Sequence, residues 1–347
     1  MKVLLGEVAK ESRLVKIERI VASKDEMLDA LFERTYVALT PAAKRVYLTL
    51  CRWRSLIPQI ALEAVLIRPT NEKMDVEAAI DELVRSSFIE SMDDESGARF
   101  ITVPLVGAVF GRRKVEFSPM KVAIEADVEL LQEIGATRVS GLAQGVQPRI
   151  ERLFRYAANE MSRDSLRYDE YIPMLEFLCR RYVPAWLMLA ALFEETGMPN
   201  GLTKAKDAIR RLLERAEDSA LCRHAWEELA RLCQQTQDWS GEIQALVGSC
   251  KVPNTPFSTL SNAANRLNAI FKEDHLVLNS EEKRIVVREL VELLERRLAE
   301  ADATDLSRLA WLCLHIGDDD RARQHVKSGL ALDSANQYCV NLRDRLL

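Results

Sequence analysis

The side chains that could support nucleophilic or metal chemistry are seven cysteines and four histidines. Two pairs lie close in the sequence, Cys222-x-His224 and Cys313-x-His315. Both pairs fall in stretches with helical periodicity, where residues i and i+2 point to different sides, and zinc sites use other spacings. A Cys-His nucleophile would also need a third group to orient the base, and no such partner is evident. We therefore predict no catalytic residue and no metal site.

Binding of a phosphate group is the second kind of chemistry to consider. The motif G-x-x-x-x-G-K-[ST], whose backbone cradles nucleotide phosphates, does not occur among the 13 glycines. The strongest basic cluster is Arg112-Arg113-Lys114, directly after Gly111. It is interpreted either as a patch for an anion or acidic partner, or as a solvated turn that anchors the next helix. The run Asp318-Asp319-Asp320 could attract a cation, but its place between two helical stretches predicts a turn.

The composition limits the class of protein. A chain of 347 residues is long enough for two or three domains, and a hydrophobic fraction of 48% is ample for packed cores. The net charge of −5 argues against general adhesion to nucleic acid or to an anionic membrane. The cysteines form no C-x-x-C pair, which indicates reduced thiols, and no apolar run is long enough to span a membrane. We expect a cytoplasmic protein with no membrane partner.

One element that positions several of the candidate residues is a helical hairpin between Ala303 and Ser334. Its first helix carries an apolar stripe, its second carries small residues, and a Gly-Asp turn joins them. The same frame recurs around Trp186 and around Trp226, and it resembles the tetratricopeptide repeat over roughly the last half of the chain. The middle unit departs from the pattern, because Glu242 occupies the small position of its second helix. Such hairpins cannot bury their apolar faces alone, so we expect them to stack into an α-solenoid.

This resemblance implies a binding groove, because the first helix of each tetratricopeptide unit lines a concave surface. The positions implied in the middle unit are His224, Glu227, Arg231, Gln234 and Gln235. The positions implied in the last unit are Thr304, Ser307, Trp311 and His315. Trp311 does not fit the internal core pattern of its unit, so it either packs against a neighbouring unit or is an exposed binding anchor. The expected partner is a protein or a peptide.

The first half of the chain has a different pattern. Thr40-Pro41 places an N-cap before a proline at the first helical position, and further helices are expected over 58–66 and 75–86. Two short apolar stretches, 88–92 and 99–103, then predict a β-hairpin. Three helices followed by a hairpin form a winged helix-turn-helix.

Winged helices often bind DNA, so the charges of this one matter. The helix in the reading position carries four acidic residues against a single arginine; they are Asp75, Glu77, Asp81 and Glu82. The tip of the hairpin is also acidic, with the sequence Asp93-Asp94-Glu95. These groups repel the phosphates whose contacts dominate DNA affinity. A structural or regulatory module is therefore predicted, and nucleic acid is not an expected partner.

The run from Leu28 to Leu48, followed by a winged helix and helical repeats, resembles the STAND (NB-ARC-like) signalling ATPases. The stretch from Val3 to Ala9 resembles the helix after that family's nucleotide-contacting segment. The resemblance implies an upstream ATPase domain that holds ATP or ADP and is a partner of this chain, whereas no cofactor is expected in the chain itself. Many members carry a His-Asp pair where this chain has Thr102 to Leu105, without histidine. Met1 to Lys10 begins inside an amphipathic helix without a cap, which indicates a piece of a longer protein.

Together these features predict a mainly α protein, with a winged helix-turn-helix domain followed by an α-solenoid of tetratricopeptide-like hairpins. The expected domains are a helical segment (1–39), the winged-helix domain (40–117), a connecting helix and linker (118–145) and the repeat domain (146–347). The resemblance implies a non-catalytic regulatory and sensor region of a bacterial STAND-type signal-transduction ATPase, whose winged helix relays nucleotide state and whose repeats bind the trigger. The alternative is a winged-helix DNA-binding transcriptional regulator with a repeat-type partner-binding domain. A third possibility, a hydrolase, has no supporting motif.

Overall fold

The computed structural model describes residues 24–53, 55–95, 97–134, 146–272 and 280–346. The expected helix at Met1 to Lys10 and the 135–145 part of the expected linker lie outside these residues. The chain divides into two compact units, Met1–Leu192 and Phe193–Leu347, and the division falls inside helix α10 (Ala185–Glu195). The boundaries at 39/40, 117/118 and 145/146 stay predictions. Within the described part of the chain, no helix is both long and apolar enough to cross a membrane.

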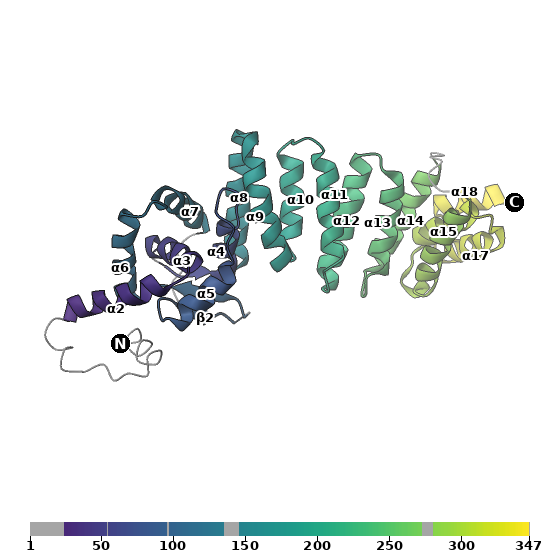
Figure 1. The fold of residues 1–347 in the computed structure, drawn as a ribbon. Helices are drawn as coiled ribbons and strands as arrows, with labels where there is room; N and C mark the ends of the chain where they lie inside the picture. The colour runs from purple at the N-terminus through teal and green to yellow at the C-terminus, as the bar shows by residue number, and fades with distance from the viewer. Residues whose placement is uncertain (1–23, 54, 96, 135–145, 273–279, 347) are drawn as a thin grey trace. The chain divides into compact units, whose positions relative to one another are not determined.

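The first unit contains a module of three helices and a small sheet, which we call the three-helix module. Its elements in chain order are α3 (Pro41–Arg52), β1 (Ile57–Pro58), α4 (Gln59–Leu66), α5 (Val76–Arg85), β2 (Glu90–Asp93) and β3 (Arg99–Thr102). The strands are antiparallel in the order β1-β3-β2, and Ser91 lies opposite Ile101 in the hairpin. The three helices and the hairpin follow one another in the order predicted for the winged helix-turn-helix, whereas the short strand β1 was not predicted. Figure 1 shows α3, α4 and α5 beside strand β2.

The first helix of this module begins where its capping residue predicts. Thr40 Oγ1 accepts a hydrogen bond from Ala43 N at 3.2 Å, and Pro41 is the first helical residue. Thr40 also joins two helices, because its backbone N–H and its hydroxyl donate to the Glu82 carboxylate at 3.0 and 2.6 Å. The predicted start at Thr40-Pro41 is confirmed, and its cap also ties α3 to α5.

The remaining elements of unit 1 that the structure describes are helices. Its further helices are α2 (Lys24–Ala38), α6 (Leu105–Glu116), α7 (Lys121–Ile134), α8 (Gln147–Arg163) and α9 (Tyr168–Arg181), with the first turns of α10. The interpretation of Gly111 to Lys114 as a turn is wrong, because these residues lie in the last turns of α6. A Cβ at Gly111 would lie 2.1 Å from Cys51 Sγ. The glycine therefore allows α6 to pack closely against α3, where the sequence alone indicated a break.

A buried ionic network joins the three-helix module to α7 and α9. Asp127 is fully buried on α7 and accepts hydrogen bonds from Arg45, from Arg68 Nη2 at 2.5 Å and from Asn71 Nδ2 at 3.0 Å. Arg68 also donates to Glu170 on α9. Buried charges require partners of this kind, since an unpaired charge in the core is strongly destabilising. The network therefore holds α3, α7, α9 and the segment after α4 in one arrangement.

The second unit is a stack of antiparallel helices (Figure 1). They are α11 (Gly201–Leu213), α12 (Ser219–Gln235), α13 (Trp239–Lys251), α14 (Phe257–Lys272), α15 (Ser280–Glu295), α16 (Ala303–His315), α17 (Asp319–Leu332) and α18 (Gln337–Leu346), with a 3₁₀ turn at Leu298–Glu300. Helices that follow one another in the chain pack side by side, α12 on α13 and α16 on α17. The protein is mainly α, as predicted, and this unit has the stacked hairpins of an α-solenoid.

Glycines shape the hairpins of this unit at two kinds of position. A Cβ at Gly248 would lie 2.6 Å from Cε2 of Trp226, so this glycine permits the close crossing of α12 and α13. Gly317 has φ +76° in the turn between α16 and α17, a conformation that favours glycine. The predicted turn at Asp318-Asp319-Asp320 is the start of α17, where Asp318 Oδ1 caps the helix by accepting from Arg321 N.

The unusual Glu242 of α13 is accommodated by a partner from the next helix. Its side chain is buried, and its two carboxylate oxygens accept hydrogen bonds from Arg266 Nε and Nη2 on α14 at 2.5 and 3.1 Å. A bidentate pair of this kind satisfies the buried charge. The repeat pattern has a small residue at this position, whereas Glu242 forms an ion pair there that links successive hairpins.

Candidate functional site

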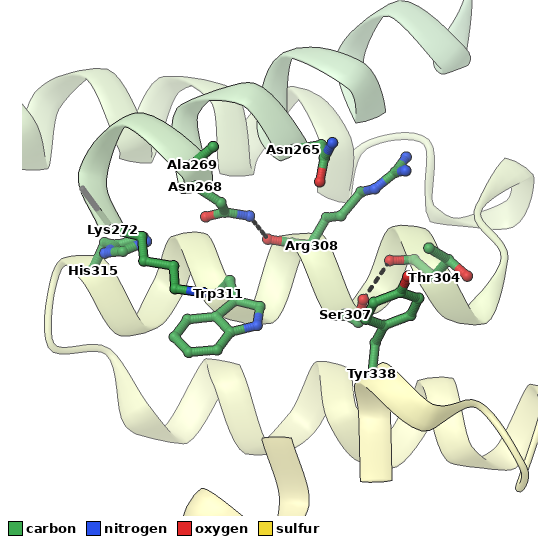
Figure 2. Close-up of a pocket in the computed structure, with 10 residues that line it drawn as sticks. All are labelled: Asn265, Asn268, Ala269, Lys272, Thr304, Ser307, Arg308, Trp311, His315 and Tyr338. Atoms are coloured by element: carbon green, nitrogen blue, oxygen red, sulfur yellow. Dashed lines mark hydrogen bonds between the residues drawn. The ribbon is translucent and has the colours of Figure 1, made fainter. Parts of the chain in front are cut away.

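Four of the predicted groove residues line one pocket of unit 2, which lies between α14, α16 and α18 and has a volume of about 420 Å³ (Figure 2). Helix α16 contributes the predicted Thr304, Ser307, Trp311 and His315, together with Arg308. Helix α14 contributes Asn265, Asn268, Ala269 and Lys272, and α18 contributes Tyr338. We call this the α14–α16 pocket.

Helical spacing explains why these side chains meet. The lining residues of each helix are three or four positions apart, so each set lies on one face of its helix. The start of α16 is fixed by a capping box, in which Asp305 N donates to Asp302 Oδ1 at 2.8 Å and Asp302 N donates to Asp305 Oδ2 at 3.1 Å. Because α14 and α16 pack together, their two rows of side chains face the same space.

The Trp311 indole is half-buried in the pocket wall. It packs against the apolar core of unit 2, and the Arg345 guanidinium lies 4.8 Å from the centroid of its ring. This distance corresponds to a cation–π contact. The ring therefore packs within the array and also lines a pocket, and its role as a binding anchor stays a prediction.

His315 lies at one end of the pocket and packs edge-on against Phe271, with ring centroids 5.4 Å apart. Burial, followed by the charges of Lys283 and Arg345, lowers the pKa of His315 to about 4 from its ordinary 6.5. The imidazole is therefore neutral at neutral pH and has one donor and one acceptor. It can orient a ligand through a hydrogen bond without adding charge.

Amide and hydroxyl groups form most of the polar wall. Asn268 Nδ2 donates to the Arg308 carbonyl oxygen at 2.9 Å, and Ser307 Oγ donates to the Thr304 carbonyl oxygen at 2.7 Å (Figure 2). Asn268 Oδ1 is buried and has no hydrogen-bond partner within the part of the chain that the structure describes. An unsatisfied buried acceptor costs about 1–3 kcal/mol.

The five residues predicted in the middle unit lie on α12 and do not line the α14–α16 pocket. His224, Glu227, Gln234 and Gln235 are exposed. Arg231 is already paired, since its Nη1 and Nη2 donate to the two Glu194 oxygens at 2.8 and 2.7 Å. The hydrogen bond from Arg231 lowers the pKa of Glu194, which fits a stable ion pair. Arg231 therefore has a structural role within unit 2.

The basic cluster on α6 is also paired. Arg112 Nε donates to the Cys51 carbonyl oxygen at 3.0 Å. Arg113 donates to both carboxylate oxygens of Asp29, at 2.9 and 2.7 Å, and Lys114 Nζ donates to Glu33 Oε1 at 2.8 Å. An anion would have to compete with these carboxylates on α2. The cluster attaches α6 to α2, and its role as an anion or partner patch stays a prediction.

The two thiols that pair with a histidine in the sequence, Cys222 and Cys313, have no environment that would activate them. Burial raises the pKa of the Cys313 thiol to about 12, and burial also raises the pKa of Cys222. Nucleophilic cysteines have lowered pKa values, because the thiolate is the reactive form. In the described ranges, no group of three or more histidine, cysteine or acidic side chains is placed to hold a metal ion.

The α14 side of the pocket was not predicted from the sequence. Asn265, Asn268 and Lys272 follow the same three-or-four spacing as the α16 residues. The sequence of α14 lacks the tryptophan of the first two recognised units, so the repeat pattern alone does not identify it. The regular spacing of its polar residues is the signal that could have identified this wall.

Comparisons with known proteins give little further information. No protein-family model and no curated protein matches the chain. Among solved structures, it is similar to a signal transduction ATPase with numerous domains (STAND protein) with a tetratricopeptide repeat sensor from Pyrococcus horikoshii, at 14% sequence identity and a TM-score of 0.26. The match covers 90% of this chain and 47% of that one, so the chain spans about half the length of that structure. A likeness at this level supports no assignment of family or function.

Proposed function

We propose that the chain is a non-catalytic regulatory and sensor region of a STAND-type signalling ATPase in the bacterial cytoplasm. In this proposal, unit 2 binds a protein or peptide segment in the α14–α16 pocket. The three-helix module relays nucleotide state, and ATP or ADP is held by an ATPase domain that precedes residue 1. The resemblance of the 28–48 segment and the order of the elements in unit 1 support the link to this family.

The observation that carries the binding role is the composition of the α14–α16 pocket. Its volume lies within the range of about 300–1,000 Å³ that is common for ligand sites. Trp311 supplies an aromatic anchor, and Asn265 and Asn268 supply amides for hydrogen bonds to a peptide main chain (Figure 2). A concave surface on the first helices of successive hairpins is suited to holding an extended segment.

A sensor must also change state when its ligand binds. A ligand shifts a conformational equilibrium only if it binds one state more tightly than the other. Within unit 1, the Asp127 network fixes α7 and α9 to the three-helix module, which favours movement as one body. Such a body supports the proposed relay, because a displacement of α9 would be transmitted to the module.

The charges of the three-helix module disfavour the DNA-binding alternative. Glu77 and Asp81 on α5 have exposed or partly exposed side chains, and Arg99 of the hairpin lies 3.6 Å from Asp81. A DNA phosphate would therefore meet acidic groups, with the nearby arginine already in an ion pair. A salt-dependent mobility shift with a duplex of random sequence would favour the alternative.

Peptide selection tests the binding role. Random dodecapeptides on phage are selected against the full 347-residue chain, and enriched peptides are labelled and measured by fluorescence anisotropy. Asn265→Trp fills the pocket from an exposed position, so it should weaken binding about tenfold or more. Asn262→Trp makes the same replacement at an exposed position on α14 outside the pocket and should have little effect. Equal binding by the two variants would place the peptide elsewhere.

A further inference from the structure

We infer that the α14–α16 pocket selects an acidic peptide segment, whose carboxylates lie between Lys272 and Arg308. The inference rests on the proposed function, because it takes this pocket as the place where the array binds its partner. It goes further by assigning the chemical class of that partner.

The charges of the pocket wall are of one sign. None of the residues that line the pocket in the described chain carries a carboxylate, whereas Lys272 and Arg308 are both cationic. The remaining lining side chains are neutral, and several of them donate hydrogen bonds. A basic segment would meet two like charges here, while an acidic one would meet charge-assisted donors from both helices.

The two cations have hydrogen-bonding capacity to spare. Lys272 is exposed and forms no ion pair with any residue that the structure describes. Arg308 Nη1 donates to Ser261 Oγ at 2.8 Å and lies 3.5 Å from Asp305 Oδ1. The Nε and Nη2 groups of Arg308 have no hydrogen bond among the described residues, so they remain available to a ligand.

Two further cations lie around the end of the pocket that contains His315. Arg345 stacks on Trp311, and Lys283 Nζ lies 4.5 Å from the centroid of the Phe271 ring. Phe271 packs against His315, whose pKa is lowered first by burial and then by the charges of both cations, so their positive charge acts at this end of the pocket. His315 does not add to this charge at neutral pH, because it is neutral. An acidic ligand would reduce the repulsion among these groups.

A short acidic segment fits this distribution better than a nucleic acid does. The chain as a whole has a net charge of −5, so a long polyanion would be repelled outside the pocket. A segment of a few residues is affected mainly by charges within a Debye length of about 10 Å. The asparagine and hydroxyl groups of the wall also match the N–H and C=O groups of a peptide main chain.

Three fluorescein-labelled decapeptides test the inference on the full chain. Each peptide contains one tyrosine and one leucine. The remaining positions are Glu and Asp in the acidic peptide, Ser and Gln in the neutral peptide, and Lys and Arg in the basic peptide. The acidic peptide should bind about tenfold or more tightly than the neutral one, and the basic one should not bind. The affinity of the acidic peptide should decrease as the salt concentration increases, because salt screens exposed charges. A single-stranded RNA decamer is measured alongside.

A pair of variants isolates the local charge from the net charge. Lys272→Gln should weaken binding of the acidic peptide about fivefold and leave the affinity for the neutral peptide unchanged. Lys327→Gln makes the same change of charge at an exposed position on α17 outside the pocket, so it should have no effect. Circular dichroism confirms that both variants are folded.

The outcomes separate this inference from the proposed function. Equal affinity for acidic and neutral peptides, or equal effects of Lys272→Gln and Lys327→Gln, would overturn the acidic preference while leaving the binding role intact. RNA that binds more tightly than the acidic peptide would also overturn it. If no peptide, including those selected on phage, responds to Asn265→Trp, the proposed function itself fails.

Discussion

At the scale of the residue, a few side chains give the α14–α16 pocket its character. Trp311 and His315 were predicted from the repeat pattern, because each unit places its groove residues at fixed offsets along the first helix. The lowered pKa of His315 was not predictable from the sequence. It follows from burial and from Lys283 and Arg345, which lie on other helices and are identified only by the fold.

The titration of His315 leads to a prediction for stability. Its pKa is lowered to about 4 in the folded chain, whereas the unfolded chain retains the ordinary value of 6.5. Between these two values the unfolded chain binds more protons, so the free energy of unfolding falls as the pH drops through this window. When the pH falls from neutral to about pH 5, the free energy of unfolding should therefore decrease less for His315→Gln than for the wild type. Urea unfolding, followed by tryptophan fluorescence, measures this difference.

The control for this measurement is His224→Gln. His224 is exposed on α12, outside the pocket, so its replacement should leave the pH dependence of the wild type unchanged. If His315→Gln has the same dependence as His224→Gln, burial of the His315 ring does not determine its protonation.

At the scale of the element, local signals in the sequence determine where helices begin and where the chain turns between them. Thr40-Pro41 and the Gly-Asp turn at Gly317 act over a few residues, so they could be predicted from the sequence. Gly111 was interpreted as part of a turn, because a glycine before three basic residues is also compatible with a break. The fold uses it for close packing of α6 on α3 instead.

This packing predicts opposite effects for two glycines of the same helix. A Cβ at Gly111 would overlap Cys51 Sγ, and overpacking of this kind costs about 1–3 kcal/mol. Replacing glycine by alanine within a helix gains about 1 kcal/mol of helix propensity. We therefore expect Gly111→Ala to destabilise unit 1, because the cost of the overlap exceeds this gain. At Gly107 the nearest atoms to a Cβ are 3.5 Å away, which is ordinary contact. Gly107→Ala should therefore be neutral or stabilising.

The midpoint of urea unfolding measures both glycine variants under the same conditions. Gly111→Ala should unfold at a lower urea concentration than the wild type, and Gly107→Ala should not. Equal midpoints for the two variants would contradict the close approach of α6 to α3 at Gly111.

At the scale of the whole molecule, the features that matter most join residues far apart in the sequence. Asp127 is separated by 82 positions from Arg45 and by 59 from Arg68, so no local pattern could indicate their contact. The mainly α fold and the stacked hairpins followed from periodicity, which repeats along the chain. The pocket needed the packing of α14 on α16, and only the wall with the recognised repeat pattern was predicted.

The central claim is that unit 2 binds a peptide segment in the α14–α16 pocket. Hydrogen–deuterium exchange of the full chain, with and without a peptide selected on phage, tests it most directly. We predict slower exchange of backbone amides in α14 from 265 to 272 and in α16 from 304 to 315, because a bound segment suppresses local opening of the helices that it contacts. Slower exchange confined to α12 or to unit 1, with no change in α14 and α16, would contradict the account.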